Sequence, residues 1–377
     1  MEILIVGAGL GGLAAAAVLQ QRGHRVRVFE QAGHLGEVGA GIQVSANAMK
    51  VLDVAGVRPA LEKVAVRPQA FEFRRFDSGE LLHRLPLGDA HERAHGAPYF
   101  QLHRADLHAA LQQVVLSHDT TGVMLDARAI GITERVDGVQ VFFDGGRVAE
   151  ADLVVGADGI RSLVRRHVIG DDEPQFTGQV AWRCTVPTER IPPELRTDTV
   201  STIWCGPRNH AVTYYLRGGT LVNFVGCVER PTEEESWTAR RPWAELDADY
   251  AGWHPMVRAV VDHVDRDQCF RWALNNREVS PVWSRGAVTL LGDAVHATLP
   301  YMAQGAAMAI EDAAVLSRCL DGVEPDGIAD AFRRFEATRK ERTSRVQATS
   351  RANTWLKQKT DGDWVYGYDA WTVPLAA

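Results

Sequence analysis

The first third of the chain alternates short apolar runs with longer amphipathic stretches. Residues 2–7 form an apolar run that ends in glycine, residues 10–22 are rich in alanine and leucine, and residues 25–30 alternate apolar and polar side chains. An apolar run, a helical stretch and a second strand within about thirty residues predict a β-α-β unit with buried, parallel strands. Residues 47–66 then place apolar side chains on one side of a predicted helix.

Strand patterns dominate the middle of the chain. Residues 69–86 predict two strands joined by a turn, and residues 123–155 predict a β-meander with glycine turns. Residues 176–230 are rich in valine, threonine, tyrosine and tryptophan, which favour strands, and they predict a second, mainly antiparallel sheet. The remaining predicted elements are a buried strand at 287–292 and helices at 103–118, 303–320 and 327–357.

The 377 residues exceed what one ordinary core absorbs, so we expect two interleaved domains. The first is an α/β domain with a Rossmann-like parallel sheet, and the second is a mainly antiparallel β-sheet domain inserted into it. The predicted boundaries are 1–70, 100–175 and 265–335 for the first domain, 71–99 and 176–264 for the second, and 336–377 for a C-terminal helical tail.

Composition narrows the classes of protein that this chain can be. Apolar residues make up 46% and charged residues 24%, as in ordinary soluble proteins, and a formal net charge of −7 disfavours nucleic acid as a partner. That net charge leaves room for a locally basic pocket that holds an anionic substrate. No apolar run reaches the ~20 residues of a membrane span and no leader pattern opens the chain, so we expect a cytoplasmic protein without a membrane partner.

The cysteines are five in number and widely spaced, and even the closest two, Cys184 and Cys205, are far from a CxxC arrangement. Without such a pair we expect neither a zinc site nor a dithiol redox centre, and we predict no metal ligands. Buried, unpaired thiols in a reducing compartment are the simplest interpretation.

The first chemical motif is a GxGxxG at residues 7–12, between the first strand and the first helix. In a dinucleotide fold Gly7 permits the tight turn, Gly9 lets the backbone approach a diphosphate, and Gly12 lets the helix pack on the strand. The helix N-terminus then offers N–H groups and the positive end of its dipole. Glu30 ends the second strand at the spacing expected for a carboxylate that bonds a ribose hydroxyl. A glycine-rich helix start that binds nothing is the alternative.

Two later turns join a glycine to an acid after an apolar strand, where α/β proteins bind their ligands. Asp158 lies in one of them, at residues 156–165, and Asp293 opens the other. We interpret Asp293 as an acceptor for the ribityl hydroxyls of a flavin. Gly305 and Ala306 begin a helix whose N–H groups can stabilise negative charge on a reduced flavin. These turns favour FAD over NAD as the bound cofactor.

Together with residues 39–42 and 103–107, these motifs make the chain resemble the group A flavoprotein aromatic monooxygenases, which have the para-hydroxybenzoate hydroxylase fold. The resemblance covers nearly the whole chain. It implies FAD as the bound cofactor, NADH or NADPH as a transiently bound co-substrate, and an α/β fold whose inserted β-sheet domain binds the substrate. It also adds Gln31, Gly41 and Arg104 to the cofactor-binding residues, with Arg104 near the diphosphate and the ribityl chain.

A histidine and a tyrosine, His210 and Tyr214, stand four residues apart in a strand-like run and therefore face the same side of it. The resemblance implies that they are the catalytic pair found in family members of the 6-hydroxynicotinate type. In that family O₂ forms a flavin C4a-hydroperoxide that attacks an electron-rich ring, so a base that ionises the ring hydroxyl promotes the reaction. Either residue is open as the base, and spacing alone favours a sheet histidine beside a core tyrosine.

Three further residues complete the predicted substrate pocket. Pro300 is expected to shape its wall above the flavin, and Gln43 is expected to bond the flavin or the substrate, with a turn role equally open. Tyr215 is included as a pocket residue, although alternation along a strand turns it to the face opposite Tyr214 and favours packing. For His296 we expect a structural hydrogen bond.

The resemblance implies a monooxygenase that uses NAD(P)H and O₂ to hydroxylate a small hydroxylated aromatic carboxylate of the 6-hydroxynicotinate or salicylate type, with loss of CO₂ as one outcome. A hydroxylase of the 3-hydroxybenzoate type, which keeps the carboxylate, is the first alternative. A flavin-binding protein without catalytic activity is the second. The sequence leaves open whether the protein is a monomer or a homodimer.

Overall fold

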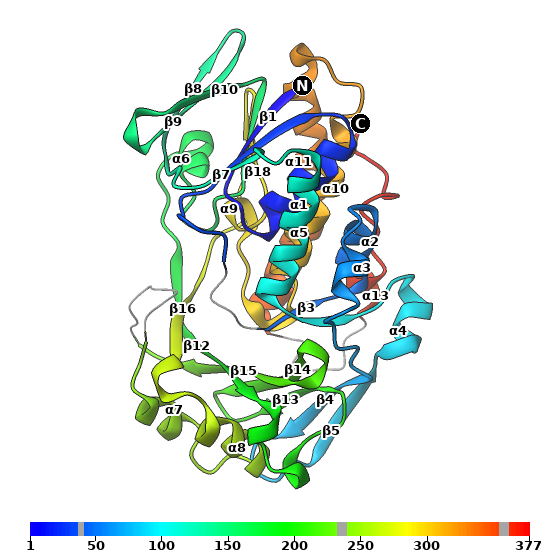
Figure 1. The fold of residues 1–377 in the computed structure, drawn as a ribbon, viewed down its shortest axis with the longest axis vertical. Helices are drawn as coiled ribbons and strands as arrows, with labels where there is room; N and C mark the ends of the chain where they lie inside the picture. The colour runs from blue at the N-terminus through cyan, green and yellow to red at the C-terminus, as the bar shows by residue number, and fades with distance from the viewer. Residues whose placement is uncertain (37–40, 232–239, 354–361) are drawn as a thin grey trace.

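The computed structural model describes residues 1–36, 41–231, 240–353 and 362–377. In Figure 1 the chain forms two connected regions, an upper one in which helices surround a parallel sheet and a lower one built on a larger sheet with two helices on its outer side. Both ends of the chain lie on the upper region. The chain passes between the regions several times, so each region is discontinuous in sequence.

Within the described residues, a six-stranded sheet in the order β17-β18-β11-β1-β2-β7 forms the centre of the upper region. Its strands are β1 (Glu2–Val6), β2 (Arg25–Phe29), β7 (Val123–Met124), β11 (Leu153–Gly156), β17 (Ser284–Arg285) and β18 (Val288–Leu290). Neighbouring strands are parallel except β17 and β18. The predicted β-α-β unit is confirmed, because β1 and β2 pair in parallel across α1 (Leu10–Gln21).

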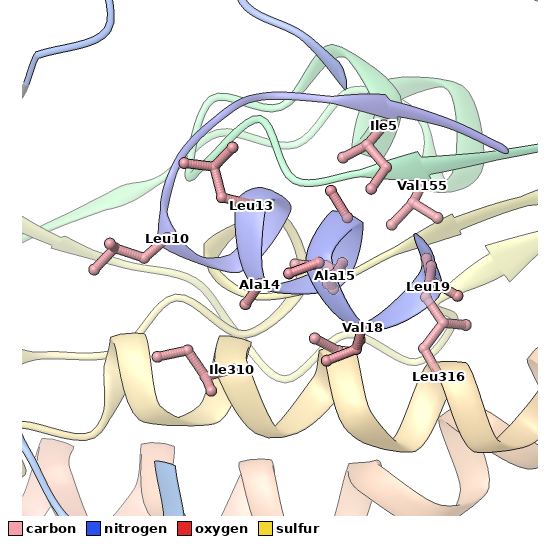
Figure 2. Close-up of a cluster of buried hydrophobic side chains, with 14 of the residues drawn as sticks. Ile5, Leu10, Leu13, Ala14, Ala15, Val18, Leu19, Val155, Ile310 and Leu316 are labelled. Atoms are coloured by element: carbon pink, nitrogen blue, oxygen red, sulfur yellow. The ribbon is translucent and has the colours of Figure 1, made fainter. Parts of the chain in front are cut away.

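Helix α1 lies between this sheet and α10 (Gly305–Cys319), as Figure 2 shows. Val18 lies on the side of α1 that faces α10, the helix of Leu316. Ile5 and Val155 of the sheet lie on the other side of α1. All of these side chains are buried, and burial of apolar surface contributes about 25 cal/mol per Å² to the stability of such a contact. The start of α1 is therefore fixed from two sides, which sets the direction of the glycine turn before it.

In the described part of the lower region, a seven-stranded sheet has the order β16-β12-β15-β14-β13-β4-β5. Its strands are β4 (Ala70–Arg75), β5 (Leu81–Pro86), β12 (Gln175–Pro187), β13 (Ser201–Cys205), β14 (His210–Leu216), β15 (Leu221–Glu229) and β16 (Phe270–Asn276). Neighbouring strands are antiparallel except β13 and β4. Helices α7 (Trp243–Asp249) and α8 (Pro255–His263) pack on one face. The predicted mainly antiparallel sheet is confirmed, but it reaches residue 276 instead of ending near residue 264.

The helix expected at residues 47–66 is two helices. Helix α2 (Ala46–Val54) is followed by Gly56, whose φ of 78° is left-handed and suits glycine, and α3 (Arg58–Leu61) begins with a proline in its first turn. The glycine and proline signals inside the amphipathic pattern thus outweighed its helical periodicity.

The meander expected at residues 123–155 is divided between two sheets. Strands β7 and β11 join the six-stranded sheet, whereas the strands between them pair with one another. These strands are β8 (Ala129–Arg135), β9 (Gly138–Phe143) and β10 (Val148–Ala151). The ladder of β3 (Gly41–Val44) with β6 (Phe100–His103) was not predicted, and β3 lies at the boundary between the two regions in Figure 1.

The other α-helices of the described residues are α4 (Gly88–His95), α5 (Arg104–His118), α6 (Leu163–Ile169), α9 (Asp293–His296), α11 (Ile328–Ala352) and α13 (Asp363–Tyr366). Across the described ranges, none of the helices has both the length and the apolar character that crossing a bilayer requires. The cysteines all lie in described segments and are unpaired thiols.

Helix α11 is not part of a separate tail, because buried ion pairs join it to α10. Arg339 donates to Glu311 and to Asp312, and Arg342 donates to Glu311, each at 2.7 Å. The side chains of Glu311, Asp312 and Arg339 are 0% exposed, so each charge depends on its partner for stabilisation. The tail predicted from residue 336 therefore begins inside α11, and the predicted end of this helix at residue 357 lies outside the described residues.

Replacing Arg339 with methionine removes the cation that Glu311 and Asp312 share. We expect Arg339→Met to lower the free energy of unfolding by about 3–5 kcal/mol, because two buried carboxylates lose a partner. Urea unfolding followed by circular dichroism measures the change. The control is Arg333→Met on the same helix, where an exposed ion pair with Asp330 is worth less than about 1 kcal/mol. Equally small losses in both variants would contradict this account of the contact between α10 and α11.

Candidate active site

A cavity lies where the two regions meet, and residues of both line it. From the upper region come Arg104, Ile160, Asp293, Gly305 and Ala306, together with residues 41–43 of β3. From the large sheet come Arg183, Val212, Tyr214, Val225, Trp272 and Leu274. Residues predicted to bind the cofactor and the predicted catalytic tyrosine therefore share one cavity, although they are far apart in the sequence.

The glycine turn before α1 leaves space at one position and none at two others. A Cβ on Gly7, where φ is 104°, would overlap the backbone of Ala157, and a Cβ on Gly12 would overlap the carbonyl of Gly7. A Cβ on Gly9 would have no atom of the described residues within 4 Å. No described side chain caps the N-terminus of α1, and its first turn holds no acid. The uncapped N–H groups and the open space at Gly9 fit a diphosphate.

Glu30 is held beside this turn at the end of β2. Its two carboxylate oxygens accept hydrogen bonds from the backbone N–H groups of Ala8 and Ala32, both at 2.9 Å. The carboxylate therefore faces the glycine turn, where a dinucleotide fold bonds its ribose hydroxyls. Gln31, the next residue, is exposed. The structure thus brings the glycine motif and the predicted ribose-binding carboxylate together.

Asp158 is placed differently from the other predicted cofactor residues. Its carboxylate accepts hydrogen bonds from the Ser162 hydroxyl at 2.5 Å and from the N–H groups of Leu163 and Val164 at 2.7 and 3.2 Å. These bonds satisfy the first N–H groups of α6, so the carboxylate fixes the start of that helix. Ile160 of the same turn lines the cavity instead. A contact between Asp158 and a cofactor remains a prediction.

Asp293 and Arg104 face the cavity from the starts of two helices, α9 and α5. Desolvation raises the pKa of the Asp293 carboxyl even though the side chain is open to the cavity, and nearby His296 and Arg104 oppose this shift. Desolvation also lowers the pKa of Arg104, and Asp293 opposes that shift. The two residues are therefore partly compensating charges in the wall of the cavity.

The N-terminus of α10 also faces the cavity, through Gly305 and Ala306. Among the described residues no side chain caps it, so the positive end of its dipole is available to a ligand. Behind it, the Nε2 of His296 lies 2.6 Å from Oδ2 of Asp312, which also accepts the Gly292 N–H at 3.0 Å. The structural hydrogen bond expected for His296 is confirmed, and it ties the turn before α9 to α10.

His210 and Tyr214 lie on the same face of β14, as their spacing predicted. Tyr214 lines the main cavity, whereas His210 lines an adjoining hollow that shares Gln43, Val212 and Pro300 with it. Desolvation lowers the pKa of His210 to about 4, although the ring keeps some exposure, so it is neutral at pH 7. Burial raises the pKa of the Tyr214 hydroxyl, which therefore stays protonated. A neutral His210 ring, which can accept a proton, and a protonated Tyr214 hydroxyl, which can donate a hydrogen bond, thus line neighbouring parts of one site.

The absence of a side chain on Gly41 makes room for the ring of Tyr214. A Cβ on Gly41 would lie 2.5 Å from the Tyr214 hydroxyl oxygen, so a side chain at this position would displace the tyrosine. The N–H of Gly41 donates to Oδ1 of Asn223 at 2.6 Å, which holds β3 against the large sheet. Residues 39 and 40 of the predicted motif lie outside the described residues.

Gln43 and Pro300 both line the main cavity and the adjoining hollow, and their contact with a substrate remains a prediction. Gln43 lies in a strand and not in a turn. It accepts a hydrogen bond from the Tyr99 hydroxyl and donates one to the Ser201 hydroxyl, both at 2.9 Å. These two bonds hold its amide in a fixed orientation at the wall of the cavity.

Tyr215 must be removed from the predicted pocket. Its ring belongs to the core under α7 and α8, on the opposite face of the large sheet, and its hydroxyl donates to the Thr197 carbonyl at 3.0 Å. Successive side chains of a strand point to opposite faces, so Tyr214 and Tyr215 cannot both face the cavity.

Arg183, Trp272 and Tyr301 are among the lining residues that were not predicted. Arg183 in β12 holds its guanidinium over the ring of Trp272, 3.9 Å from the centroid. Tyr301 lies edge-on to His210 with ring centroids 5.5 Å apart, and its hydroxyl bonds Gln179. Arg183 is the one charged residue of β12, and that is a signal that could have identified it. For the two aromatic residues the sequence pattern holds no such signal.

Residues 1–351 match the family of FAD binding domains, and the chain belongs to it. It is 38% identical over 382 residues to 6-hydroxynicotinate 3-monooxygenase of Pseudomonas fluorescens. The matched region covers 99% of this chain and 96% of that protein. The chain is 40% identical over 351 residues to 3-amino-4-hydroxybenzoate 2-monooxygenase of Streptomyces cremeus, covering 93% and 86%. The resemblance to flavoprotein aromatic monooxygenases, predicted from the motifs, is confirmed.

Solved structures agree with the predicted fold. The chain of HpxO from Klebsiella pneumoniae, crystallised with FAD and uric acid, is 27% identical with a TM-score of 0.85, over 97% of this chain and 95% of that one. A salicylate hydroxylase in its substrate complex has a TM-score of 0.82 at 24% identity, over 98% and 96% of the two chains, a likeness of fold alone. The predicted para-hydroxybenzoate hydroxylase type of fold is confirmed.

The lowered pKa of His210 predicts a pH dependence of stability. The pKa is about 4 in the folded protein against an ordinary value of 6.5, so the unfolded chain binds the additional proton first as the pH falls. Between these values the free energy of unfolding therefore decreases with falling pH, by at most about 1.4 kcal/mol per pH unit from this group. We expect His210→Asn to reduce that slope, measured by urea unfolding at a series of pH values.

The matched control for this measurement is His34→Asn, at an exposed position. If His210→Asn and His34→Asn gave the same slope as the unchanged protein, the ring of His210 would not be desolvated as described.

Proposed function

We propose that this protein is a FAD-dependent monooxygenase that uses NADH or NADPH and O₂ to hydroxylate a small hydroxylated aromatic carboxylate. The observation that carries the proposal is the shared cavity, with the uncapped N-terminus of α10 and Asp293 of the FAD-binding region on one side and Tyr214 of the large sheet on the other. The two relatives described above act on 6-hydroxynicotinate and 3-amino-4-hydroxybenzoate, which are both hydroxylated aromatic carboxylates.

The residues present fit FAD. Gly9 and the start of α1 would hold the diphosphate, Glu30 the ribose, and Asp293 with Arg104 the ribityl chain. The start of α10 would face the electron-rich edge of the ring system. When bound, FAD accepts a hydride from the nicotinamide and supplies activated oxygen.

The large sheet would prepare the aromatic ring. Tyr214 keeps its proton, so its hydroxyl can donate a hydrogen bond to the oxygen substituent of the substrate. His210 is neutral at pH 7, so a nitrogen of its ring can accept the proton of the substrate hydroxyl. An oxyanion formed beside the resulting imidazolium stabilises it and raises the pKa of His210 in the complex. We therefore assign His210 as the base and Tyr214 as the residue that orients the ring oxygen.

The remaining cavity wall would exclude water from the ring. Val212 and Val225 extend from the large sheet, and Leu299 and Pro300 face them from the turn after α9. An apolar enclosure protects a reactive oxygen species from wasteful reaction with water. It also strengthens each polar contact that the substrate makes inside the cavity.

The proposed substrate is a hydroxylated aromatic acid, and the reaction can either release its carboxylate as CO₂ or retain it. Oxygen entering at the carbon that bears the carboxylate releases CO₂, as the 6-hydroxynicotinate and salicylate types require. A second candidate, which keeps the carboxylate, is favoured by 35% identity over 351 residues to 3-hydroxybenzoate 6-hydroxylase of Klebsiella oxytoca.

The proposal is tested by NADH or NADPH oxidation and O₂ uptake with purified holoenzyme. We expect at least one of 6-hydroxynicotinate, salicylate and 3-hydroxybenzoate to stimulate both, and analysis of the product then shows whether the carboxylate is lost. If the protein holds FAD and none of these or related aromatic acids stimulates turnover, it is a flavin-binding protein without this activity.

Removing the proposed base or the proposed donor should slow the reaction itself. We expect His210→Asn and Tyr214→Phe each to lower kcat roughly 100-fold or more, which is the usual contribution of positioned acid–base groups. Flavin absorbance checks that both variants keep FAD. Tyr215→Phe, on the opposite face of β14, is the control that should keep the original kcat. Unchanged kcat across pH in His210→Asn would show that His210 is not the base.

A further inference from the structure

Arg183 is a cation in the cavity wall, and none of the described residues gives it a carboxylate partner. Its Nε is buried and has no hydrogen-bond partner among the described residues. Desolvation lowers the pKa of Arg183 to about 9, and repulsion by Arg104 adds to the shift, so the guanidinium stays protonated at pH 7. The groups that oppose the shift are Tyr214 and Cys227, and no carboxylate of the described residues is among them.

Another arginine of the same sheet shows how such a charge is normally satisfied. Arg271 in β16 lies over the ring of Trp182, 4.8 Å from its centroid, and its Nη1 also donates to Glu245 at 2.5 Å. A guanidinium removed from water costs free energy unless it is paired. Arg183 has the aromatic contact but no carboxylate partner within the described part of the chain. Its charge is therefore left to a ligand in the cavity that it lines.

The charged side chains of the described residues that line the cavity favour an anionic ligand. Of the described residues, three charged side chains line it: Arg104, Arg183 and Asp293. Arg104 and Asp293 partly compensate each other, which leaves one positive charge on Arg183. The glycine turn would hold the diphosphate of FAD, and the start of α10 would stabilise negative charge on the reduced ring, so neither group needs Arg183. The second occupant of the cavity, the aromatic substrate, is left to supply the anion.

The strand register places Arg183 opposite the proposed catalytic pair. Arg183 pairs with Val225, which pairs with Val212, so Arg183 lies two strands from β14 and level with the point midway between His210 and Tyr214. With strands about 4.8 Å apart and alternate residues about 6.8 Å apart, its Cα lies roughly 12 Å from the Cα of each. Arg183 and Tyr214 line the same cavity, and His210 lines the hollow beside it, so a ring bound there can present its carboxylate to β12 and its hydroxyl to β14.

We propose that Arg183 binds the carboxylate of the aromatic substrate and that this ion pair selects aromatic acids over neutral phenols. The inference rests on the proposed function, because it names the contact that orients the ring against His210 and Tyr214. A guanidinium donates two parallel N–H bonds to the two oxygens of a carboxylate, an arrangement that lysine cannot reproduce. Fixing the carboxylate at Arg183 directs the hydroxyl of the ring toward β14.

The test compares each aromatic acid with its primary amide, which has nearly the same shape and no charge. Holoenzyme is titrated with 6-hydroxynicotinate and 6-hydroxynicotinamide, and with salicylate and salicylamide, while flavin absorbance reports binding. We expect Arg183→Met to weaken acid binding roughly 10- to 100-fold and to leave amide binding nearly unchanged. Arg183→Lys should keep part of the preference for acids, because it keeps the charge and loses the fork. Arg271→Met, on the opposite face, is the control that should keep the whole preference.

Two results overturn the proposal. One is an unchanged preference for acids in Arg183→Met, and the other is an unaltered holoenzyme that binds none of the acids. If Arg183 serves the flavin instead, Arg183→Met shifts the midpoint potential of FAD and leaves the preference intact, which is the first of these results. A holoenzyme that prefers acids through Arg183 but hydroxylates none of them supports the anion site and contradicts the proposed function.

Weaker acid binding by Arg183→Met would not be explained by a loss of stability in this variant. Removing a charge that has no carboxylate partner among the described residues relieves a desolvation cost, so we expect the thermal midpoint of Arg183→Met to equal or exceed that of the unaltered holoenzyme. A saturating aromatic acid should raise the midpoint of the unaltered holoenzyme more than that of Arg183→Met. Equal increases in the two proteins count against the ion pair.

Discussion

The site depends on one close backbone contact, in which the first turn of α1 packs against the carbonyl of Gly7 and leaves no room for a side chain on Gly12. This contact brings the uncapped N-terminus of α1 to the carboxyl end of β1. Because α10 holds α1 from its other side (Figure 2), the turn cannot tilt away. The open space at Gly9 and the fixed carboxylate of Glu30 follow from the same geometry, and together they make the place that a dinucleotide requires.

The other half of the site comes from the large sheet, whose alternation gives β14 two separate roles. Its outer face packs under α7 and α8, and its inner face presents His210 and Tyr214 to the cavity. The start of α10 completes the wall, and the buried ion pairs of Glu311 and Arg339 hold that helix against α11. The stability of the upper region and the shape of the cavity are therefore coupled.

The sequence predicted the features that short-range physics decides, namely the glycine turn, the carboxylate of Glu30 after the second strand, and the shared face of His210 and Tyr214. It did not predict features that depend on distant partners. The meander was divided because β7 and β11 pair with strands far away in the chain, and β16 joined the large sheet for the same reason. A local feature was also missed, because the carboxylate of Asp158 fixes the start of the helix that follows it. Whether a strand arginine such as Arg183 finds a carboxylate is decided by tertiary contacts.

We conclude that the glycine turn, together with the cavity between the upper region and the large sheet, forms the site of one flavin nucleotide. Titration of the cofactor-free protein with FAD, followed by quenching of flavin fluorescence, tests it most directly. We predict saturable binding of one FAD per chain. A colourless protein that neither retains FAD on purification nor binds it on titration would contradict the whole assignment of the site.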